Sequence, residues 1–79
     1  MNEASPLLGL RTPSEYRSDG RFHIFPTQAS LDWFTRQNST RLYERGAILA
    51  PTGRKLINPA IFDQLVLEIG SEKVLGRLG

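Results

Sequence analysis

Apolar residues follow a helical period most clearly in the last third of the chain. Residues 59–69 place five of them at the spacing of one buried helix face: Ile61, Phe62, Leu65, Val66 and Ile69. Asn58 and Pro59 predict the start of this helix, because asparagine caps free amides and proline at the first position loses no hydrogen bond. Gly70 is expected to end the helix, and Leu67 falls on the face opposite the apolar stripe.

Two further helices are predicted in the middle of the chain. Thr27 is a suitable N-cap for a helix over residues 27–37, because its hydroxyl can accept from the free amides of the first turn. A short helix is expected over residues 39–45, either separate or joined to the first by a bend, with Gly46 as a left-handed stop. Several side chains at helical spacing are expected to face the core: Trp33, Phe34, Leu42 and Tyr43.

Short strands are predicted on both sides of this helical region. Residues 47–50 and 55–57 are expected to pair as a hairpin, whose Pro-Thr-Gly turn combines a fixed φ with a residue that tolerates a positive one. Residues 21–25 alternate apolar and polar side chains in part and are interpreted as a short edge strand, which Pro26 ends.

The predicted order is therefore strand, helix, short helix, hairpin and helix. This order predicts an α+β fold, mainly α, in which residues 21–70 form a winged helix-turn-helix with a short two-stranded wing. Residues 1–20 hold two prolines and two glycines without a clear period, and we expect a flexible N-terminal arm there. Residues 71–79 are expected to form a C-terminal tail, either a frayed helix or an arm.

The composition argues against several kinds of chemistry. The 79 residues include no cysteine and one histidine, His23, which argues against disulfides and metal binding. No serine has a histidine base beside it in sequence, so we expect neither an enzyme nor a cofactor. The first ten residues lack the basic start and apolar run of a signal peptide, and no segment has membrane-spanning length. We therefore expect a cytoplasmic protein without a membrane partner.

Positive charge is concentrated in the middle of the chain. The net charge of the whole protein is +2. Residues 21–55 hold six cationic side chains against two carboxylates, a net charge of +4, whereas the segments on either side each carry −1. Such a basic patch favours a polyanionic partner, and an ordinary solvated cationic face is the alternative.

Two pairs of cations give this patch a direction. Arg41 and Arg45 are four residues apart and so share a helix face, where like charges are unfavourable unless carboxylates or arriving phosphates neutralise them. Arg54 and Lys55 lie at the tip of the predicted hairpin. Charged tips also keep hairpins soluble, so each pair has a purely structural interpretation. Taken together, the two pairs favour nucleic-acid binding.

Two segments of the chain resemble a known family. They are "FPTQASLDWF" at residues 25–34 and "ERGAILAPTGRKLINPAIFDQLV" at residues 44–66. They are similar to the excisionases, or recombination directionality factors, which are small winged-helix proteins related to the MerR-type DNA-binding domain. The shared pattern is a threonine-capped helix, a glycine before an apolar strand, a Gly-Arg turn and a Leu-Ile-Asn-Pro entry to the last helix. The resemblance covers roughly residues 25–69.

This resemblance implies a function. Excisionases bind repeated sites on double-stranded DNA cooperatively, bend the DNA and direct a site-specific integrase towards excision of a mobile element, and some regulate transcription. The resemblance therefore implies double-stranded DNA and an integrase as partners. A winged-helix transcriptional regulator without a recombination role and a protein-interaction module are the alternatives.

The chain departs from the family before Thr27, where a strand-like segment replaces the usual leading helix. This leaves two choices of recognition helix, residues 27–37 and residues 39–45. We favour residues 27–37 for base contacts, with Arg41 and Arg45 on phosphates. The predicted DNA-binding residues are Thr27, Gln28, Ser30, Asp32, Thr35, Arg36, Thr40, Arg41, Arg45, Arg54 and Lys55.

Self-association on DNA is also expected. Leu67 and the apolar residues of the tail are more than a core of this size can bury, and the acidic flanks of one copy can face the basic middle of the next. These features predict head-to-tail association along DNA through residues 1–20, Leu67 and residues 71–79.

Overall fold

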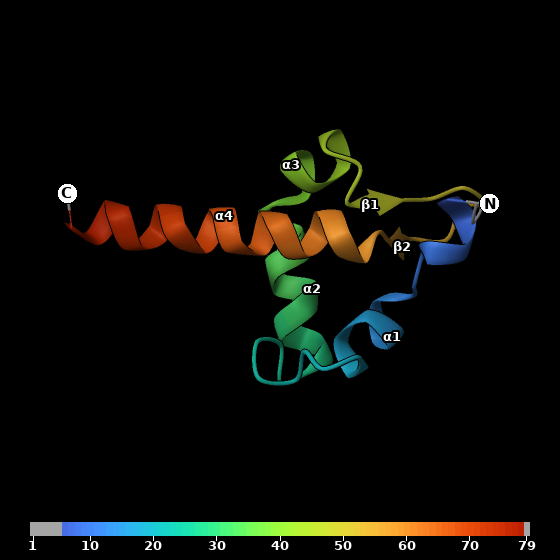
Figure 1. Ribbon diagram of the computed structural model, residues 1–79, viewed down its shortest axis with the longest axis horizontal. Helices are drawn as coiled ribbons and strands as arrows, with labels where there is room; N and C mark the ends of the chain where they lie inside the picture. The colour runs from blue at the N-terminus through green and yellow to red at the C-terminus, as the bar shows by residue number, and fades with distance from the viewer. Residues whose placement is uncertain (1–5, 79) are drawn as a thin grey trace.

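A computed structural model describes residues 6–78 of the chain and the side chains of residues 7–76. The protein is α+β and mainly helical, with one two-stranded antiparallel sheet, as the sequence predicts (Figure 1). The elements in chain order are a 3-10 helix η1 (Pro6–Gly9), α1 (Pro13–Ser18), α2 (Gln28–Gln37), α3 (Ser39–Glu44), β1 (Ile48–Leu49), β2 (Leu56–Ile57) and α4 (Pro59–Leu78). None of the described helices is both long and apolar enough to cross a membrane.

The element boundaries in the middle of the chain follow local chemistry. Thr27 caps α2 in a reciprocal capping box, in which its hydroxyl accepts from the Ser30 amide at 3.1 Å. Gly46 and Gly53 have φ values of 79° and 92°, so each takes the left-handed conformation that its turn requires. The Asn58 side chain accepts from the Ile61 amide at the start of α4. These four sequence predictions are confirmed.

The two-stranded sheet also pairs with the segment that precedes α1. Ile48 pairs with Ile57 and Leu49 with Leu56 in antiparallel register. Arg11 adds a bridge on the other side of β2: its amide donates to the Ile57 carbonyl at 2.9 Å and its carbonyl accepts from the Ile57 amide at 2.7 Å. The residues before α1 therefore lie against β2, although they were expected to form an arm.

An aromatic cluster forms the centre of the core. Phe62 of α4 is fully buried and contacts the rings of Tyr16, Phe25 and Phe34 at centroid distances of 4.8 to 6.4 Å. The other buried side chains come from α2, α3, the hairpin and α4: Leu31, Leu42, Ala47, Ile48, Ile57, Leu65 and Ile69. The predicted stripe on the last helix is confirmed, because Ile61 and Val66 pack against the same core.

The prediction of a flexible arm over residues 1–20 does not hold for its second half. Thr12 and Glu15 cap α1 reciprocally, and Tyr16 is buried in the core. The folded domain therefore begins near Arg11 and not at residue 21. A helix, α1, therefore precedes α2 in the chain, which the sequence analysis did not predict. Residues 1–5 lie outside the described part of the chain.

The predicted edge strand at residues 21–25 is wrong. This segment is a turn, in which the Arg21 carbonyl accepts from the amides of Ile24 and Phe25. The turn reverses the chain after α1, so that Phe25 enters the core while Phe22 and Ile24 remain exposed. The partial alternation of this segment thus reflects a tight turn rather than a pleated strand.

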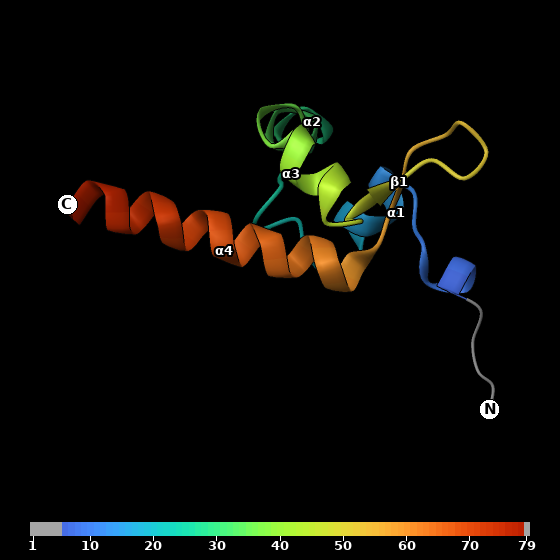
Figure 2. The same cartoon turned by 90° about the horizontal axis from the view of Figure 1, so that it is seen from above.

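The predicted stop at Gly70 is also wrong. Helix α4 continues through Gly70 to Leu78, and its C-terminal part extends beyond the other elements (Figures 1 and 2). Contacts beyond the glycine hold this part in helical form. Glu72 accepts two hydrogen bonds from Arg41, and the Lys73 ammonium lies 5.5 Å from the Trp33 ring centroid. Residues 71–78 therefore continue α4, so the helical form expected for the tail is found and the arm is not. Residue 79 lies outside the described part.

Candidate nucleic-acid interface

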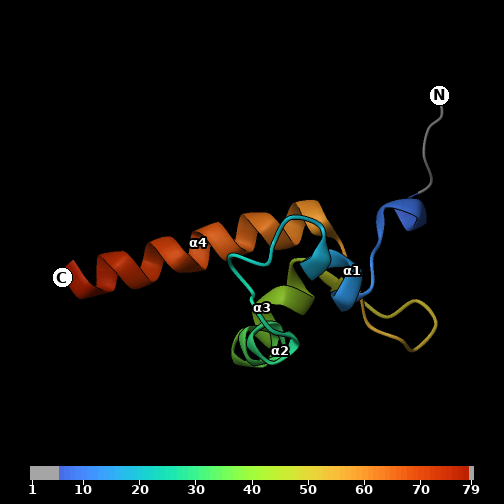
Figure 3. The same ribbon diagram turned by 90° about the horizontal axis from the view of Figure 1, so that it is seen from below.

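Helix α2 and the hairpin loop lie on the same side of the molecule, away from α4. Figures 2 and 3 show this arrangement from opposite directions, with the hairpin loop extending beside α1. The predicted DNA-binding residues of α2 and the hairpin therefore belong to elements on one side of the molecule.

A hollow of about 530 Å³ lies between α2 and the sheet, and we call it the polar groove. Its lining residues come from α1, α2, α3 and both strands: Pro13, Asp32, Thr35, Arg36, Ser39, Tyr43, Ile48, Lys55 and Ile57. Arg36 and Lys55 bring the positive charge to this groove from α2 and from the hairpin. The groove therefore combines cations, hydroxyl groups and one carboxylate in a single concave surface.

The cations of α2 and the hairpin have no carboxylate partner among the described residues. Within the described residues, Arg36, Arg54 and Lys55 form no ion pair, and all three are exposed. Arg54 lies at the hairpin tip, outside the groove. The pKa of Glu15 is lowered mainly by hydrogen bonds from Thr12, and the charges of Arg11 and Arg54 lower it slightly further. Three cations thus remain available to an anionic partner.

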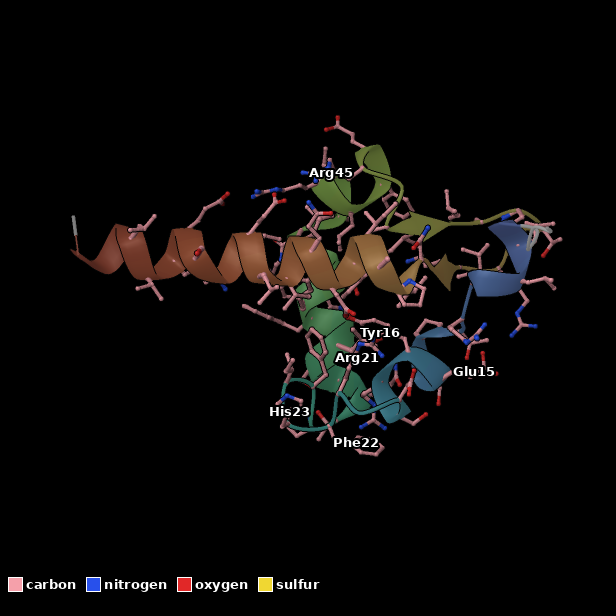
Figure 4. The ribbon with its side chains drawn as sticks, viewed as in Figure 1. Glu15, Tyr16, Arg21, Phe22, His23 and Arg45 are labelled. Carbon is pink, nitrogen blue, oxygen red and sulfur yellow. The ribbon has the colours of Figure 1, made fainter. Side chains whose placement is uncertain are left out.

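Arg41 and Arg45, which were also predicted to contact DNA, lie on another face of the molecule from the polar groove. Both turn towards α4 (Figure 4 shows Arg45 on α3) and pair with its carboxylates. Arg41 donates to both oxygens of Glu72, at 2.8 and 2.6 Å, and Arg45 approaches Glu68 at 3.3 Å. Neither arginine lines the polar groove. Their like charges are therefore neutralised within the protein by Glu68 and Glu72.

These ion pairs change the ionisation of the carboxylates on α4. Hydrogen bonds from Arg45 lower the pKa of Glu68, and those from Arg41 lower the pKa of Glu72. Both carboxylates beside α3 therefore stay ionised to a lower pH than an ordinary glutamate. A phosphate approaching this face would meet neutralised arginines and fixed carboxylates, which makes it a poor anion-binding surface.

The remaining predicted residues of α2 have mainly structural partners. Thr27 and Ser30 bond each other in the capping box. The Gln28 amide donates to the Asp32 carboxylate at 3.1 Å, and the Thr35 hydroxyl donates to the Leu31 carbonyl at 2.9 Å. Thr40 is exposed and lies outside the polar groove. Of the eleven predicted site residues, the groove thus collects four: Asp32, Thr35, Arg36 and Lys55.

Sequence reasoning missed two hydroxyl-bearing residues of the groove, Ser39 and Tyr43. Tyr43 was expected to face the core, but 43% of its surface is exposed. A signal was present, because residues 32, 36, 39 and 43 continue the spacing of one helix face across the junction of α2 and α3. Trp33 was likewise expected in the core and is half exposed, on the flank of α2 opposite the groove.

A cluster of polar side chains outside the polar groove stabilises the packing of the domain. Arg21 binds both oxygens of Asp63 at 2.9 and 2.8 Å and lies 4.0 Å from the centroid of the Tyr16 ring (Figure 4). The Tyr16 hydroxyl donates to the same carboxylate at 2.6 Å. Hydrogen bonds from Arg21 lower the pKa of Asp63, and burial raises the pKa of Tyr16. The cluster joins α1 to α4 and fixes the turn after α1.

No family model, curated protein sequence or solved structure matches the chain. Among the described residues, no group of three histidine, aspartate or glutamate side chains is arranged to hold a metal ion. The case for a function therefore rests on the polar groove and its charges.

Proposed function

We propose that the protein binds double-stranded DNA as a winged helix-turn-helix protein, with α2 in the major groove and the β1–β2 hairpin as the wing. The observation that carries this proposal is that Arg36 of α2 and Lys55 of the hairpin, nineteen positions apart in sequence, line one groove without a carboxylate partner in the described structure. Free cations on a helix and on the adjacent hairpin are the arrangement that meets bases and phosphates in this class of protein.

The geometry favours α2 over α3 as the recognition helix. Asp32, Thr35 and Arg36 of α2 line the groove, whereas the α3 arginines, Arg41 and Arg45, are paired with α4. In the proposed complex, Arg36 reads a base edge, and Arg54 and Lys55 contact phosphates. Arg41 and Arg45 are removed from the set of DNA contacts.

The biological role is proposed at the level of the family resemblance. As an excisionase, the protein would bind near the ends of a mobile element in the cytoplasm and direct an integrase towards excision. As a plain transcriptional regulator, it would bind the same DNA without affecting recombination. A recombination assay with a candidate site-specific integrase, with and without the protein, separates the two roles.

Salt-dependent DNA binding tests the proposal directly. We expect Arg54→Ala with Lys55→Ala to weaken binding to all duplexes about equally and to reduce the slope of log K against log salt by about two units, one for each phosphate contact. Arg36→Ala should instead reduce the preference for the cognate site, by about 1–3 kcal/mol if the contact is bidentate. Fluorescence anisotropy with cognate and scrambled duplexes measures both effects.

Arg45→Ala is the matched control, because it removes a cation of the same type from the face of the molecule that is paired with α4. It should leave both the salt slope and the cognate preference unchanged. If Arg45→Ala alters binding while the wing variant does not, the DNA face has been misassigned. Absence of salt-dependent duplex binding by the wild-type protein would reject DNA binding altogether.

A further inference from the structure

An apolar surface lies on the opposite flank of α2 from the polar groove. It consists of two adjoining hollows of about 370 and 310 Å³, which share Ile24 and Val66, and we call it the apolar groove. It runs along α4 from Asp63 to Lys73, between that helix, the turn after α1 and the Trp33 side of α2.

Large apolar side chains are exposed along this groove. Leu67, on α4, is 75% exposed, and Ile24 and Trp33 are about half exposed. Val74, one turn beyond Gly70 on α4, is also exposed. Several neighbouring side chains of this size form a contiguous patch rather than scattered surface residues, and such patches are typical of protein interfaces. The groove thus combines two hollows with exposed apolar side chains that could enter a hollow on a partner.

The position of Gly70 points to a close approach by another helix. Glycine in the interior of a helix destabilises it relative to alanine. Gly70 has no compensating function within one copy, because an added Cβ would meet no atom within 4 Å and its φ is not positive. Residues 63, 67, 70 and 74 follow the 4-3-4 spacing of a helix–helix seam, with the glycine near its centre. A second helix crossing at Gly70 would explain why no side chain is present there.

The charges at the two ends of the groove determine which partner fits. Asp19, Asp63 and the Arg21 guanidinium that pairs with both lie at one end, with a net charge of −1, and the Lys73 ammonium lies at the other. Asp19 is highly exposed, and its ion pair with Arg21 is weak, because the nitrogen–oxygen distance is 3.7 Å. A second copy turned end to end would place Lys73 of each copy against the acidic end of the other. A two-fold contact therefore joins opposite charges at both ends.

We propose that the protein forms a two-fold symmetric dimer through the apolar groove, with the two α4 helices antiparallel and crossing near Gly70. Leu67 of each copy then enters the hollow beside Gly70 of the other, and Lys73 of each copy faces Asp19 of the other. The polar groove, on the other flank of α2, remains open in this dimer. The inference does not rest on DNA binding, and it is tested without DNA.

Sedimentation velocity over a concentration series measures the association. We expect a monomer–dimer equilibrium that Leu67→Glu weakens by about tenfold or more, as for a central interface residue. Leu75→Glu is the matched control, because Leu75 is also highly exposed on α4 but lies outside the groove. Circular dichroism of both variants should match that of the wild type, since neither leucine is in the core.

A charge exchange tests the antiparallel arrangement itself. Lys73→Glu and Asp19→Lys should each weaken the dimer, and the double variant should restore it, because each restored contact joins the two copies. Gly70→Leu should also abolish dimerisation while leaving the monomer helical.

Three outcomes would overturn the proposal. One is a wild-type protein that stays monomeric at every concentration. The second is growth beyond dimers, which would indicate the head-to-tail association expected from the sequence. The third is an equal effect of the Leu67 and Leu75 variants, which would place the contact outside the groove.

Discussion

The two flanks of α2 differ in how the fold treats their side chains. On the hairpin flank, the exposed residues are charged or carry hydroxyl groups, and the cations Arg36 and Lys55 have no ion pair within the described residues. On the α4 flank, the large exposed side chains are apolar, Ile24, Trp33 and Leu67, and the charged residues Asp19, Arg21, Asp63 and Lys73 lie towards the ends of the groove. One ten-residue helix thus separates a surface suited to a polyanion from one suited to a protein.

The comparison also distinguishes cations that form ion pairs within the protein from cations that form none among the described residues. Arg41 and Arg45 were grouped with the other cations because sequence spacing shows only that they share a helix face. In the fold they fasten α3 to α4, which leaves the hairpin flank as the cationic surface. A basic patch counted from sequence therefore overstates the charge that a partner can meet.

The largest loss of stability is expected from shortening a core side chain on which both flanks of α2 depend. Phe62→Ala deletes a fully buried ring that contacts Tyr16, Phe25 and Phe34. We expect a loss of about 3–5 kcal/mol in the free energy of unfolding, which is a large part of the stability of a small domain. Urea denaturation followed by circular dichroism measures it. Phe22→Ala, at an exposed position, is the control; an equal loss there would contradict the assigned core.

Removing the Arg21–Asp63 ion pair should cause the next largest loss of stability. Asp63→Asn removes an ionised acceptor from both Arg21 and Tyr16 and should cost about 2 kcal/mol at neutral pH. The folded pKa of Asp63 is lowered from 3.8, so its contribution to stability is present above that value and is lost as the pH falls through the folded pKa. The difference between wild type and variant should therefore shrink in acid.

Urea titrations at a series of pH values measure this difference. A gap between the two proteins that stays constant down to the folded pKa of Asp63 and below would show that the carboxylate charge contributes nothing.

The start of α2 supports both flanks and should have a smaller effect. Thr27→Ala removes the hydroxyl that accepts from the Ser30 amide, and we expect a loss of about 1 kcal/mol. Thr27→Asp should retain most of the stability, because aspartate is an equally good cap. Thermal unfolding distinguishes the two variants. Equal losses in both would indicate that the position matters for a reason other than capping.

The smallest effect on stability is expected on the hairpin flank. Arg36→Ala with Lys55→Ala removes two exposed cations without ion-pair partners in the described structure, so the unfolding free energy should change by less than about 0.5 kcal/mol. Retained stability combined with weakened DNA binding would sharpen the contrast between the two flanks. A marked loss of stability would show that these cations have a structural function within the domain.

The sequence alone determined the parts of the fold that depend on neighbouring residues. Thr27 and Asn58 begin their helices because a side chain accepts from backbone amides three residues away. Gly46 and Gly53 form their turns because glycine readily adopts a positive φ. The apolar stripe of α4 follows from helical periodicity. Each of these features is local, so pattern and residue type were sufficient to predict it.

Only the tertiary structure decided which groups meet across the chain. The Arg41–Glu72 and Arg21–Asp63 contacts join residues 31 and 42 positions apart, and no local pattern selects these partners. The same distant contacts carry α4 past Gly70 and draw the segment with Tyr16 into the core. Caps and turns depend on the nearest few residues, whereas ion pairs and burial depend on where the whole chain brings its elements together. The sequence therefore predicted most of the elements, and the fold determined which of their charges remain free.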